Sequence, residues 1–309
     1  MRKIIVVDDE PITRMDICEI LREANYEVVA EAGDGFDAIE QSRKYKPDFV
    51  IMDVKMPILD GLKAAKIITE NKLSRGVVLL TAYSNKEFIE EAKNIGIIGY
   101  IVKPIDEKSF IPNLEIIFNK QEEFEELEKK YSAVKELAEK EHKRIVILGS
   151  GILKGLSEEL SLKIMELSGG KVVSVSNTPL GFRHGPKAII NEETVIFELV
   201  NQNGYAQKYD EGLLEEMYEE KIAERLVAYC IDSNETIKAV THETLQPSES
   251  EIRQIADKEL ASLFIYLVYG QMYAFFKSQY LGNTTDNPFP TGEVNRVVKK
   301  FKIHKFENK

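Results

Sequence analysis

The chain has 309 residues, of which 43% are hydrophobic and 30% charged, so it is long enough for about two globular domains. Acidic residues outnumber basic ones by 52 to 41, and the formal net charge of −11 argues against nucleic-acid binding, which needs a basic face. We expect a cytoplasmic protein without a signal peptide or a membrane segment, because Asp8 and Asp9 interrupt the first apolar run and no run approaches the roughly 18 apolar residues of a membrane helix.

Short apolar runs alternate with amphipathic segments in the first third of the chain. The segments expected to be strands are 3–9, 26–32, 48–53, 76–83 and 99–104. The segments expected to be helices are 16–24, 37–45, 61–70 and 85–96. Such alternation predicts a parallel sheet covered on both faces, with the chemistry beyond the carboxyl ends of its strands.

Polar residues close several of these strands. Asp8 and Asp9 follow the first, Asp53 the third, Thr81 the fourth and Lys103 the fifth. In a parallel sheet these side chains converge at one edge, where three carboxylates repel one another unless a cation such as Mg²⁺ joins them. An ammonium and a hydroxyl beside them suit the oxygens of a phosphoryl group carried on a carboxylate. The pattern therefore predicts phosphoryl transfer to aspartate.

Residues 1–119 resemble the receiver domain of a two-component response regulator, through VVDDEP, IMDVKMP, LLTAYS and YIVKP. The resemblance implies a histidine kinase or a small phosphodonor as partner and Asp53 as the phosphorylated residue. It also implies that Mg²⁺ is held by Asp8, Asp9, Asp53 and the backbone carbonyl near Lys55, and that the phosphoryl group is read by Thr81, Lys103 and the mobile ring of Tyr100.

Residues 107–143 are rich in Glu and Lys and contain no glycine. Their apolar positions recur at spacings of four and three, which is typical of a coiled-coil seam. We predict a coiled-coil linker over 120–143 and a homodimer formed through 110–138; the alternative is a single amphipathic helix lying on the domain. The seam consists of Phe110, Leu114, Ile117, Gln121, Phe124, Leu127, Tyr131, Val134 and Ala138.

The strand–helix alternation then resumes. Strands are expected at 143–151, 171–176, 194–200, 225–232 and 236–240, with helices at 152–168 and 248–282. We therefore predict a second α/β domain over 144–309. The whole chain is expected to hold two doubly wound parallel-sheet domains joined by a long coiled-coil helix.

Candidate site residues of this second domain lie on a turn, a helix and a loop. The turn Gly149, Ser150 and Gly151 opens the helix and offers amide groups to an anion. Glu159, Lys163 and Glu166 share one helix face, where a solvent-exposed charge pair is the simpler reading. His184 stands in LGFRHGPK, which taken alone reads as a surface turn.

Residues 144–304 resemble the second half of a sugar isomerase (SIS) domain protein of the tagatose-6-phosphate ketose/aldose isomerase or galactosamine-6-phosphate deaminase-isomerase family. LGSGILKGLSEE, LGFRHGPKAIIN, YAQKYDEGLL and GNTTDNPFPTGEVNRVV carry the resemblance. It implies a flavodoxin-like fold and a proton transfer between C1 and C2 by Glu166, with His184 assisting ring opening. It also implies that Glu159 and Lys163 orient the base and that Arg296 closes the site.

The family enzymes have two SIS halves, and the first half carries the Ser/Thr-rich loop that grips the substrate phosphate. This chain has a receiver-like segment there instead, which leaves three hypotheses open. The favoured one is a response regulator phosphorylated on Asp53 whose SIS-type output binds a sugar phosphate or a partner. The second is an isomerase or deaminase of a hexose or hexosamine 6-phosphate, its site completed by another subunit. The third is a fusion with an inactive SIS half.

Overall fold

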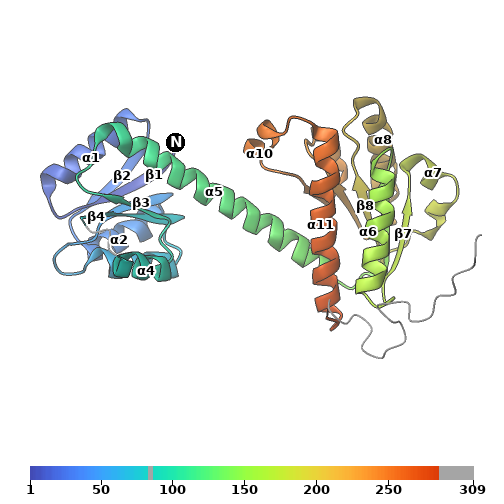
Figure 1. Cartoon of the computed structure of the whole chain (residues 1–309), viewed down its shortest axis with the longest axis horizontal. Coiled ribbons are helices and arrows are strands. Elements are labelled where there is room, and N and C mark those ends of the chain that lie inside the picture. Colours follow the sequence, from blue (N-terminus) through green and yellow to red (C-terminus); the bar gives the residue numbers. More distant parts are fainter. Residues whose placement is uncertain (83–85, 285–309) are drawn as a thin grey trace, which may run out of the picture. The chain divides into compact units, whose positions relative to one another are not determined.

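A computed structural model describes residues 1–82 and 86–284 and divides the chain into two compact units, 1–125 and 126–309. The first unit (blue to green in Figure 1) is a five-stranded parallel sheet in the order β2-β1-β3-β4-β5. Its elements are β1 Lys3–Val7, α1 Pro11–Glu23, β2 Glu27–Ala32, α2 Gly35–Tyr45, β3 Phe49–Asp53, α3 Gly61–Glu70, β4 Gly76–Thr81, α4 Lys86–Ile95, β5 Gly99–Val102 and α5 Glu107–Ala138, whose last turns belong to the second unit.

Helices cover both faces of this first sheet. Successive strand residues point to opposite faces, so Ile5 packs toward α2 and α3 while Ile4 packs toward α1 and α5. The central strands are apolar on both sides because no face of them meets water. The doubly wound sheet predicted from the alternation is confirmed.

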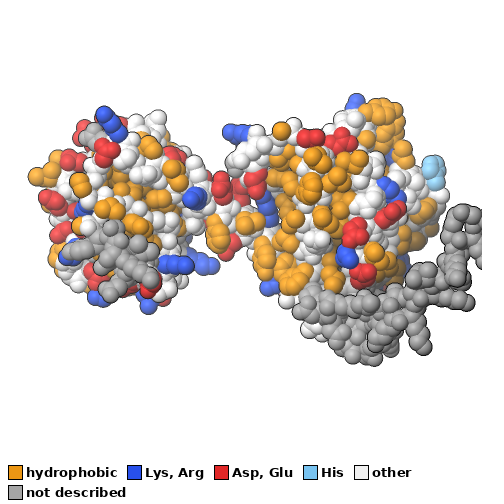
Figure 2. Space-filling model, in the orientation of Figure 1, with side chains coloured by type: hydrophobic (Ala, Val, Ile, Leu, Met, Phe, Trp, Pro, Cys, Tyr) orange, Lys and Arg blue, Asp and Glu red, His pale blue; other side chains and the backbone are white. Residues whose placement is uncertain are grey.

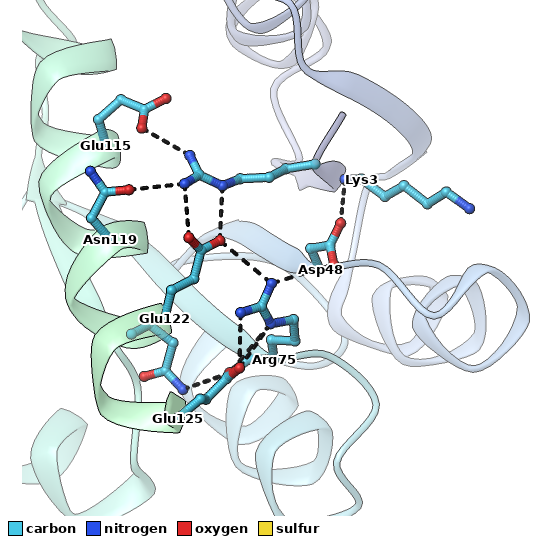
Figure 3. A network of polar contacts seen from close by, with 9 residues as sticks. Lys3, Asp48, Arg75, Glu115, Asn119, Glu122 and Glu125 are labelled. Carbon is cyan, nitrogen blue, oxygen red and sulfur yellow. Dashed lines mark hydrogen bonds and ion pairs between the residues drawn. The ribbon is translucent and has the colours of Figure 1, made fainter. Parts of the chain in front are cut away.

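Two arginines that directly precede strands of the first sheet hold α5 against the rest of the first unit. Arg2 precedes β1 and bonds Glu115, Asn119 and Glu122 on α5, at 2.8, 2.9 and 3.0 Å. Arg75 precedes β4 and pairs with Glu125 at 2.8 Å. Figure 3 shows the guanidinium group of Arg75 pointing at the helix, toward Glu122 and Glu125. This network fixes α5 up to the last residue of the first unit.

The second unit is also a five-stranded parallel sheet, in the order β10-β9-β8-β6-β7. Its elements are β6 Arg144–Gly149, α6 Leu153–Leu167, β7 Val173–Asn177, α7 Pro179–Arg183, the 3₁₀ helix η1 Pro186–Ile189, β8 Thr194–Leu199, α8 Gly204–Glu220, β9 Arg225–Tyr229, α9 Glu235–Val240, β10 Glu243–Leu245, α10 Glu249–Gln254 and α11 Lys258–Tyr280. Helices again lie on both faces. The end of α5, α6 and α11 cover one face, and α7 and α8 cover the other.

Two sequence expectations for this unit need correction. Residues 236–240 were predicted as a strand, which is wrong, since they lie in α9, where Asn234 caps the first turn by accepting from the amide of Ile237 at 2.9 Å. The long helix predicted over 248–282 is two helices. Asp257 accepts from the amide of Leu260 at 3.0 Å and starts α11 afresh.

The regular apolar spacing along α5 serves two separate cores. Phe110 and Leu114 are buried in the core of the first unit, and Val134 and Ala138 in the core of the second. Intramolecular packing therefore accounts for both ends of the predicted seam. The coiled coil and the homodimer remain predictions.

Two polar side chains secure the segment that joins α5 to β6. His142 lies 2.7 Å from Glu224 through Nδ1 and 3.0 Å from the carbonyl of Leu137 through Nε2. Lys277, buried on α11, donates to the carbonyl of Lys140. The last turn of α5 is thus tied to the body of the second unit.

Helix α11 is long and apolar enough, by length and composition, to cross a membrane, although no such segment was expected. Its inner face is part of the core, since Tyr266, Tyr273 and Phe276 are buried against the sheet and its neighbours. We interpret α11 as a core helix for that reason.

Candidate functional site

The polar edge predicted for the first unit is assembled by three strands. Asp8 follows β1, Asp53 ends β3, and Lys103 follows β5. The Lys103 ammonium lies 2.8 Å from Asp8 Oδ2 and 2.6 Å from Asp53 Oδ1, so it joins the two carboxylates. Both aspartates are buried, whereas Lys103 is partly exposed. One cation thus serves two carboxylates at the carboxyl end of the sheet.

The other predicted residues surround this centre. Thr81 is buried at the end of β4, and the amide of Lys55 donates to Asp53 Oδ2 at 3.0 Å. Asp9 and Tyr100 are exposed, the first beside Asp8 and the second on β5. The structure therefore places Thr81 and Lys55 at the edge with Asp53, and leaves the carboxylate of Asp9 facing solvent.

Burial and charge oppose each other at Asp53. Burial raises its pKa above the ordinary value, and this outweighs the hydrogen bond and positive charge of Lys103. Burial also pulls down the pKa of Lys103, but the two carboxylates more than compensate and leave that pKa raised. Lys103 is accordingly held as a cation between two acids.

A glycine lets the next helix start directly against Asp53. A Cβ on Gly61 would lie 2.0 Å from the backbone oxygen of Asp53, so only glycine fits at this position. The Gly61 amide donates to the carbonyl of Val54 at 2.9 Å, and Asp60 caps α3 through the amide of Lys63. This close packing fixes the loop that carries Lys55.

Oxygen ligands suited to Mg²⁺ are present here, since two buried carboxylates and the exposed Asp9 lie at one edge. Within the described ranges 1–82 and 86–284, however, no three Asp, Glu, His or Cys side chains lie close enough to form a metal-binding group. Lys103 instead bridges Asp8 and Asp53, and Asp9 is exposed. The carboxylates are of the type that binds Mg²⁺. In this structure the Lys103 ammonium lies between two of them.

In the second unit, the turn after β6 is closed by a neighbouring loop. Asn201 donates from its side chain to Ser150 Oγ at 3.0 Å and to the Ser150 carbonyl at 3.3 Å. Gly151 has a φ of 57°, and a Cβ there would lie 3.5 Å from the Asn201 amide nitrogen. The predicted anion-binding turn is thus packed against Asn201.

The charged helix face is present as predicted. Lys163 pairs with Glu166 at 2.9 Å and with Glu159 at 3.8 Å, and all three side chains are partly exposed. Hydrogen bonding to Glu166 raises the pKa of Lys163. This geometry agrees equally with a solvated charge cluster and with a base held beside a cation.

His184 is not near Glu166 within one chain. Glu166 lies on α6, which packs with Leu160 and Ile164 on the sheet face that includes Ile147. His184 caps α7, which packs through Phe182 on the opposite face. The helices that carry the two residues therefore lie on opposite sides of the sheet. Arg296 lies outside the described residues.

Sequence reasoning missed a buried acidic group beside the Ser150 turn. Asp210 on α8 is buried and accepts from the amide of Asn201 at 2.8 Å. Glu198 on β8 is fully buried, and neither carboxylate oxygen has a hydrogen-bond partner among the described residues. Burial raises the pKa of Asp210 to about 7 and that of Glu198 well above its usual range. The sequence signal that could have revealed it is Glu198 itself, a glutamate inside the apolar run TVIFELV.

Comparison with known proteins identifies two domains. Residues 4–115 match the response regulator receiver domain, and residues 138–274 match the SIS domain. Transcriptional regulatory protein PdtaR of Mycobacterium tuberculosis is 38% identical over 165 residues, which cover 52% of this chain and 79% of that protein.

Further relatives are sugar-phosphate enzymes by name. D-galactosamine-6-phosphate deaminase AgaS of Escherichia coli O157:H7 is 40% identical over 165 residues, 53% of this chain and 41% of that protein. The chain therefore spans about two fifths of the length of this relative. A tagatose-6-phosphate ketose/aldose isomerase structure from Clostridium novyi NT, 25% identical, has a TM-score of 0.52 and covers 98% of this chain and 85% of its own. The chain belongs to the response regulator family and joins a receiver domain to an SIS domain.

Proposed function

We propose that Asp53 accepts a phosphoryl group from a histidine kinase or a small phosphodonor, and that the SIS domain binds a sugar phosphate or a partner in response. The observation that carries this proposal is the Lys103 ammonium held between Asp8 and Asp53. A cation at that place can neutralise charge on the oxygens of a phosphoryl group attached to Asp53.

Mg²⁺ would be held by Asp8, Asp9, Asp53 and the backbone carbonyl near Lys55, and would supply positive charge to the transferring phosphoryl group. Asp53 then forms the new O–P bond while the bond from phosphorus to the donor breaks. Thr81 and Lys103 would bind the phosphoryl oxygens, and Tyr100 would move with Thr81. Receiver domains commonly use Mg²⁺ in this way. The proposed cytoplasmic location suits a histidine kinase or a small phosphodonor as partner.

A sugar phosphate is the proposed ligand class for the SIS domain because relatives that share this domain are named for galactosamine 6-phosphate and tagatose 6-phosphate. Catalysis is not the favoured role, since Glu166 and His184 lie on opposite faces of the sheet. The predicted pairing through 110–138 would rest mainly on Phe124, Leu127 and Tyr131, which are the large apolar members of the seam that stay exposed.

The test is phosphorylation of the purified chain by acetyl phosphate with Mg²⁺, followed by intact-protein mass. We expect one phosphoryl group on the parent chain and none on Asp53→Asn. Asp60→Asn is the matched control, because this nearby residue caps α3 and asparagine caps equally well. Phosphate uptake that survives in Asp53→Asn would contradict the assignment.

Calorimetry then addresses the SIS domain. Tagatose 6-phosphate and galactosamine 6-phosphate are titrated into the parent chain and into Asp53→Asn, each with and without acetyl phosphate, and inorganic phosphate serves as control. We expect an affinity for one sugar phosphate that changes with phosphodonor only in the parent chain. Identical affinities in all four conditions would exclude coupling between the domains.

A further inference from the structure

Two buried acids face each other between β8 and α8. On β8, Ile196 packs toward α7 and α8, and Glu198 points to the same side because it lies two positions further along the strand. On α8, Leu213 and Leu214 pack into that same core, and Asp210 shares their helix face because it precedes them by three and four positions. Burial, and after it the negative charge of Asp210, raises the pKa of Glu198. The two carboxyl groups thus meet from opposite elements.

These two residues, which we call the acid pair, leave three carboxylate oxygens without a hydrogen-bond partner among the described residues. They are both oxygens of Glu198 and Oδ1 of Asp210. Arg183 on α7 is close enough for its charge to act on Glu198, but its Nε pairs with Glu216 at 3.1 Å. At the surface, in contrast, acidic side chains lie beside basic ones, as Figure 2 shows over α6. A buried carboxylate without a cation is costly, so the acid pair is held at least partly protonated.

Hydrogen bonds connect the acid pair to the Ser150 turn, by which we mean Gly149, Ser150 and Gly151. Asp210 Oδ2 accepts from the backbone amide of Asn201 at 2.8 Å. The side chain of Asn201 in turn donates to Oγ and to the carbonyl oxygen of Ser150, at 3.0 and 3.3 Å. Asn201 is itself buried, which shields these bonds from water. The position of the turn therefore depends on Asp210 through a single intervening residue.

Titratable and charged groups from several elements surround the acid pair. Burial raises the pKa of Cys230 on β9 and that of Tyr266 on α11, so both stay uncharged near neutral pH. Glu211, the next residue on α8, is partly exposed and adds negative charge beside Asp210. Arg183 is a cation throughout. Burial raises the pKa of Asp210 to about 7, which makes Asp210 the residue of this cluster that exchanges a proton near neutral pH.

We propose that Asp210 couples the binding of an anion at the Ser150 turn to the uptake of a proton, acting through Asn201 as a positioning residue of the turn. A sugar phosphate is the anion in question, so this coupling rests on the proposed function. Negative charge on the turn repels an ionised Asp210, and the bound state therefore favours the protonated acid. The proton comes from solvent and forms an O–H bond at Oδ1, the oxygen that lacks a partner among the described residues. Linkage requires the proton to strengthen anion binding by the same factor.

The experiment is calorimetric titration of the full chain with tagatose 6-phosphate at pH 7 and pH 8.5. The phosphate of this ligand, with a second pKa of about 6, is almost fully ionised at both values, so the ligand itself changes little. Asp210 is about half ionised at the lower pH and almost fully ionised at the higher. We expect binding by the parent chain to be about tenfold weaker at pH 8.5.

Two variants separate this coupling from a structural role. Asp210→Asn still accepts from the amide of Asn201 but takes up no proton, so its affinity should be the same at both pH values. Glu211→Gln is the matched control, because it removes a neighbouring negative charge and should keep the pH dependence of the parent chain. A residue that only supported the fold would change the affinity equally at both pH values. Circular dichroism checks that both variants are folded.

A count of protons needs no variant. Titrations of the parent chain at pH 8, in two buffers of different ionisation enthalpy, give the number of protons bound together with the ligand. We expect between about one half and one proton per ligand. Sulfate, whose charge does not change over this pH range, tests whether an anion alone causes the uptake.

The outcomes for the proton and for the sugar ligand are distinct. Tagatose 6-phosphate that binds with equal affinity at both pH values, or without proton uptake, overturns the coupling and leaves the proposed function standing. A pH dependence that persists in Asp210→Asn overturns the role of Asp210. Proton uptake with sulfate, without binding of tagatose 6-phosphate, supports the coupling and contradicts this sugar phosphate as the ligand. Binding of neither anion overturns both.

Discussion

Glu166 and His184 belong to helices α6 and α7, which pack on opposite faces of the same β-sheet, although the two residues are only eighteen positions apart in the chain. Proton transfer requires both groups within hydrogen-bonding reach of one substrate. We therefore expect the purified chain to turn over neither tagatose 6-phosphate nor galactosamine 6-phosphate. A coupled assay for ketose formation and ammonia release, with the double variant Glu166→Gln/His184→Ala as background, measures this.

Turnover that disappears in Glu166→Gln would contradict that expectation. Mixing the single variants Glu166→Gln and His184→Ala then tells how the site is built. Activity recovered in the mixture would mean that each site draws its two residues from different chains. Activity absent from the mixture would mean that both residues serve the same site from one chain.

Removing Lys103 should strengthen Mg²⁺ binding. Its ammonium neutralises Asp8 and Asp53, so Lys103→Ala leaves two carboxylates facing each other without a cation. We expect about tenfold tighter binding by calorimetry, near the lower end of the interaction of two unit charges about 4 Å apart. Lys63→Ala is the control, since Lys63 pairs with Asp60 at an exposed position. Weaker Mg²⁺ binding in Lys103→Ala would mean that the lysine supports the site rather than competing for it.

Asp210 should make the protein less stable as the pH rises through neutrality. Burial raises the pKa of Asp210 to about 7 in the folded state, against 3.8 for the free group. Above pH 4 the unfolded chain loses this proton while the folded chain keeps it, so the free energy of unfolding falls until the pH passes about 7. At about 1.4 kcal/mol per pKa unit, the loss is up to about 4 kcal/mol.

Asp210→Asn removes this effect and still accepts the hydrogen bond from the amide of Asn201. Urea unfolding at pH 5 and pH 8 should show the variant gaining clearly more stability over the parent chain at pH 8 than at pH 5. A difference that is the same at both pH values would refute the assignment. Glu198→Gln, at the neighbouring buried acid, should behave in the same direction.

The contact between α6 and α11 depends on Gly270. Its missing Cβ would lie 2.4 Å from Leu160, so Gly270→Ala should overpack the core and lower the free energy of unfolding by about 1–3 kcal/mol. Gly155 on α6 is the matched control, since a Cβ there meets nothing within 4 Å. Gly155→Ala should stabilise the helix by up to about 1 kcal/mol. Urea unfolding of both variants checks the pair, and equal effects would mean that the close approach is not tight.

The polar edge of the first unit could be predicted because its residues are read from strand ends. The apolar runs before Asp8, Asp53 and Thr81 identify the strands, and parallel strands bring their carboxyl ends together whatever their order. The positions of Asp8, Asp53 and Lys103 in the structure agree with that argument. The position of the Lys103 ammonium between the two carboxylates could not be predicted, since sequence spacing does not give distances between side chains.

The separation of Glu166 from His184 could not be predicted, because it depends on strand order. The chain moves from β6 outward to β7 and then back past β6 to β8. Right-handed crossovers made in opposite directions lie on opposite faces of a sheet, so α6 and α7 are separated. Sequence periodicity shows that both segments exist but says nothing about the direction of each crossover.

The apolar spacing of α5 was ambiguous for a different reason. A helix whose two ends are buried in two different cores shows the same apolar repeat as a helix paired with another chain. Phe110 and Val134 satisfy the pattern while packing within their own units. The strand predicted over 236–240 failed because the β-branched residues there outweighed the capping signal of Asn234.

Each unit carries a single cysteine in its interior, Cys18 in the first and Cys230 in the second. Burial raises the pKa of both thiols, so neither forms the reactive thiolate in the native state. A thiol reagent therefore labels each residue only when its own unit opens. Mass spectrometry of the two labelled peptides follows the opening of the receiver and of the SIS domain separately in one sample, and phosphodonor or sugar phosphate added to that sample reports which of the two each compound protects.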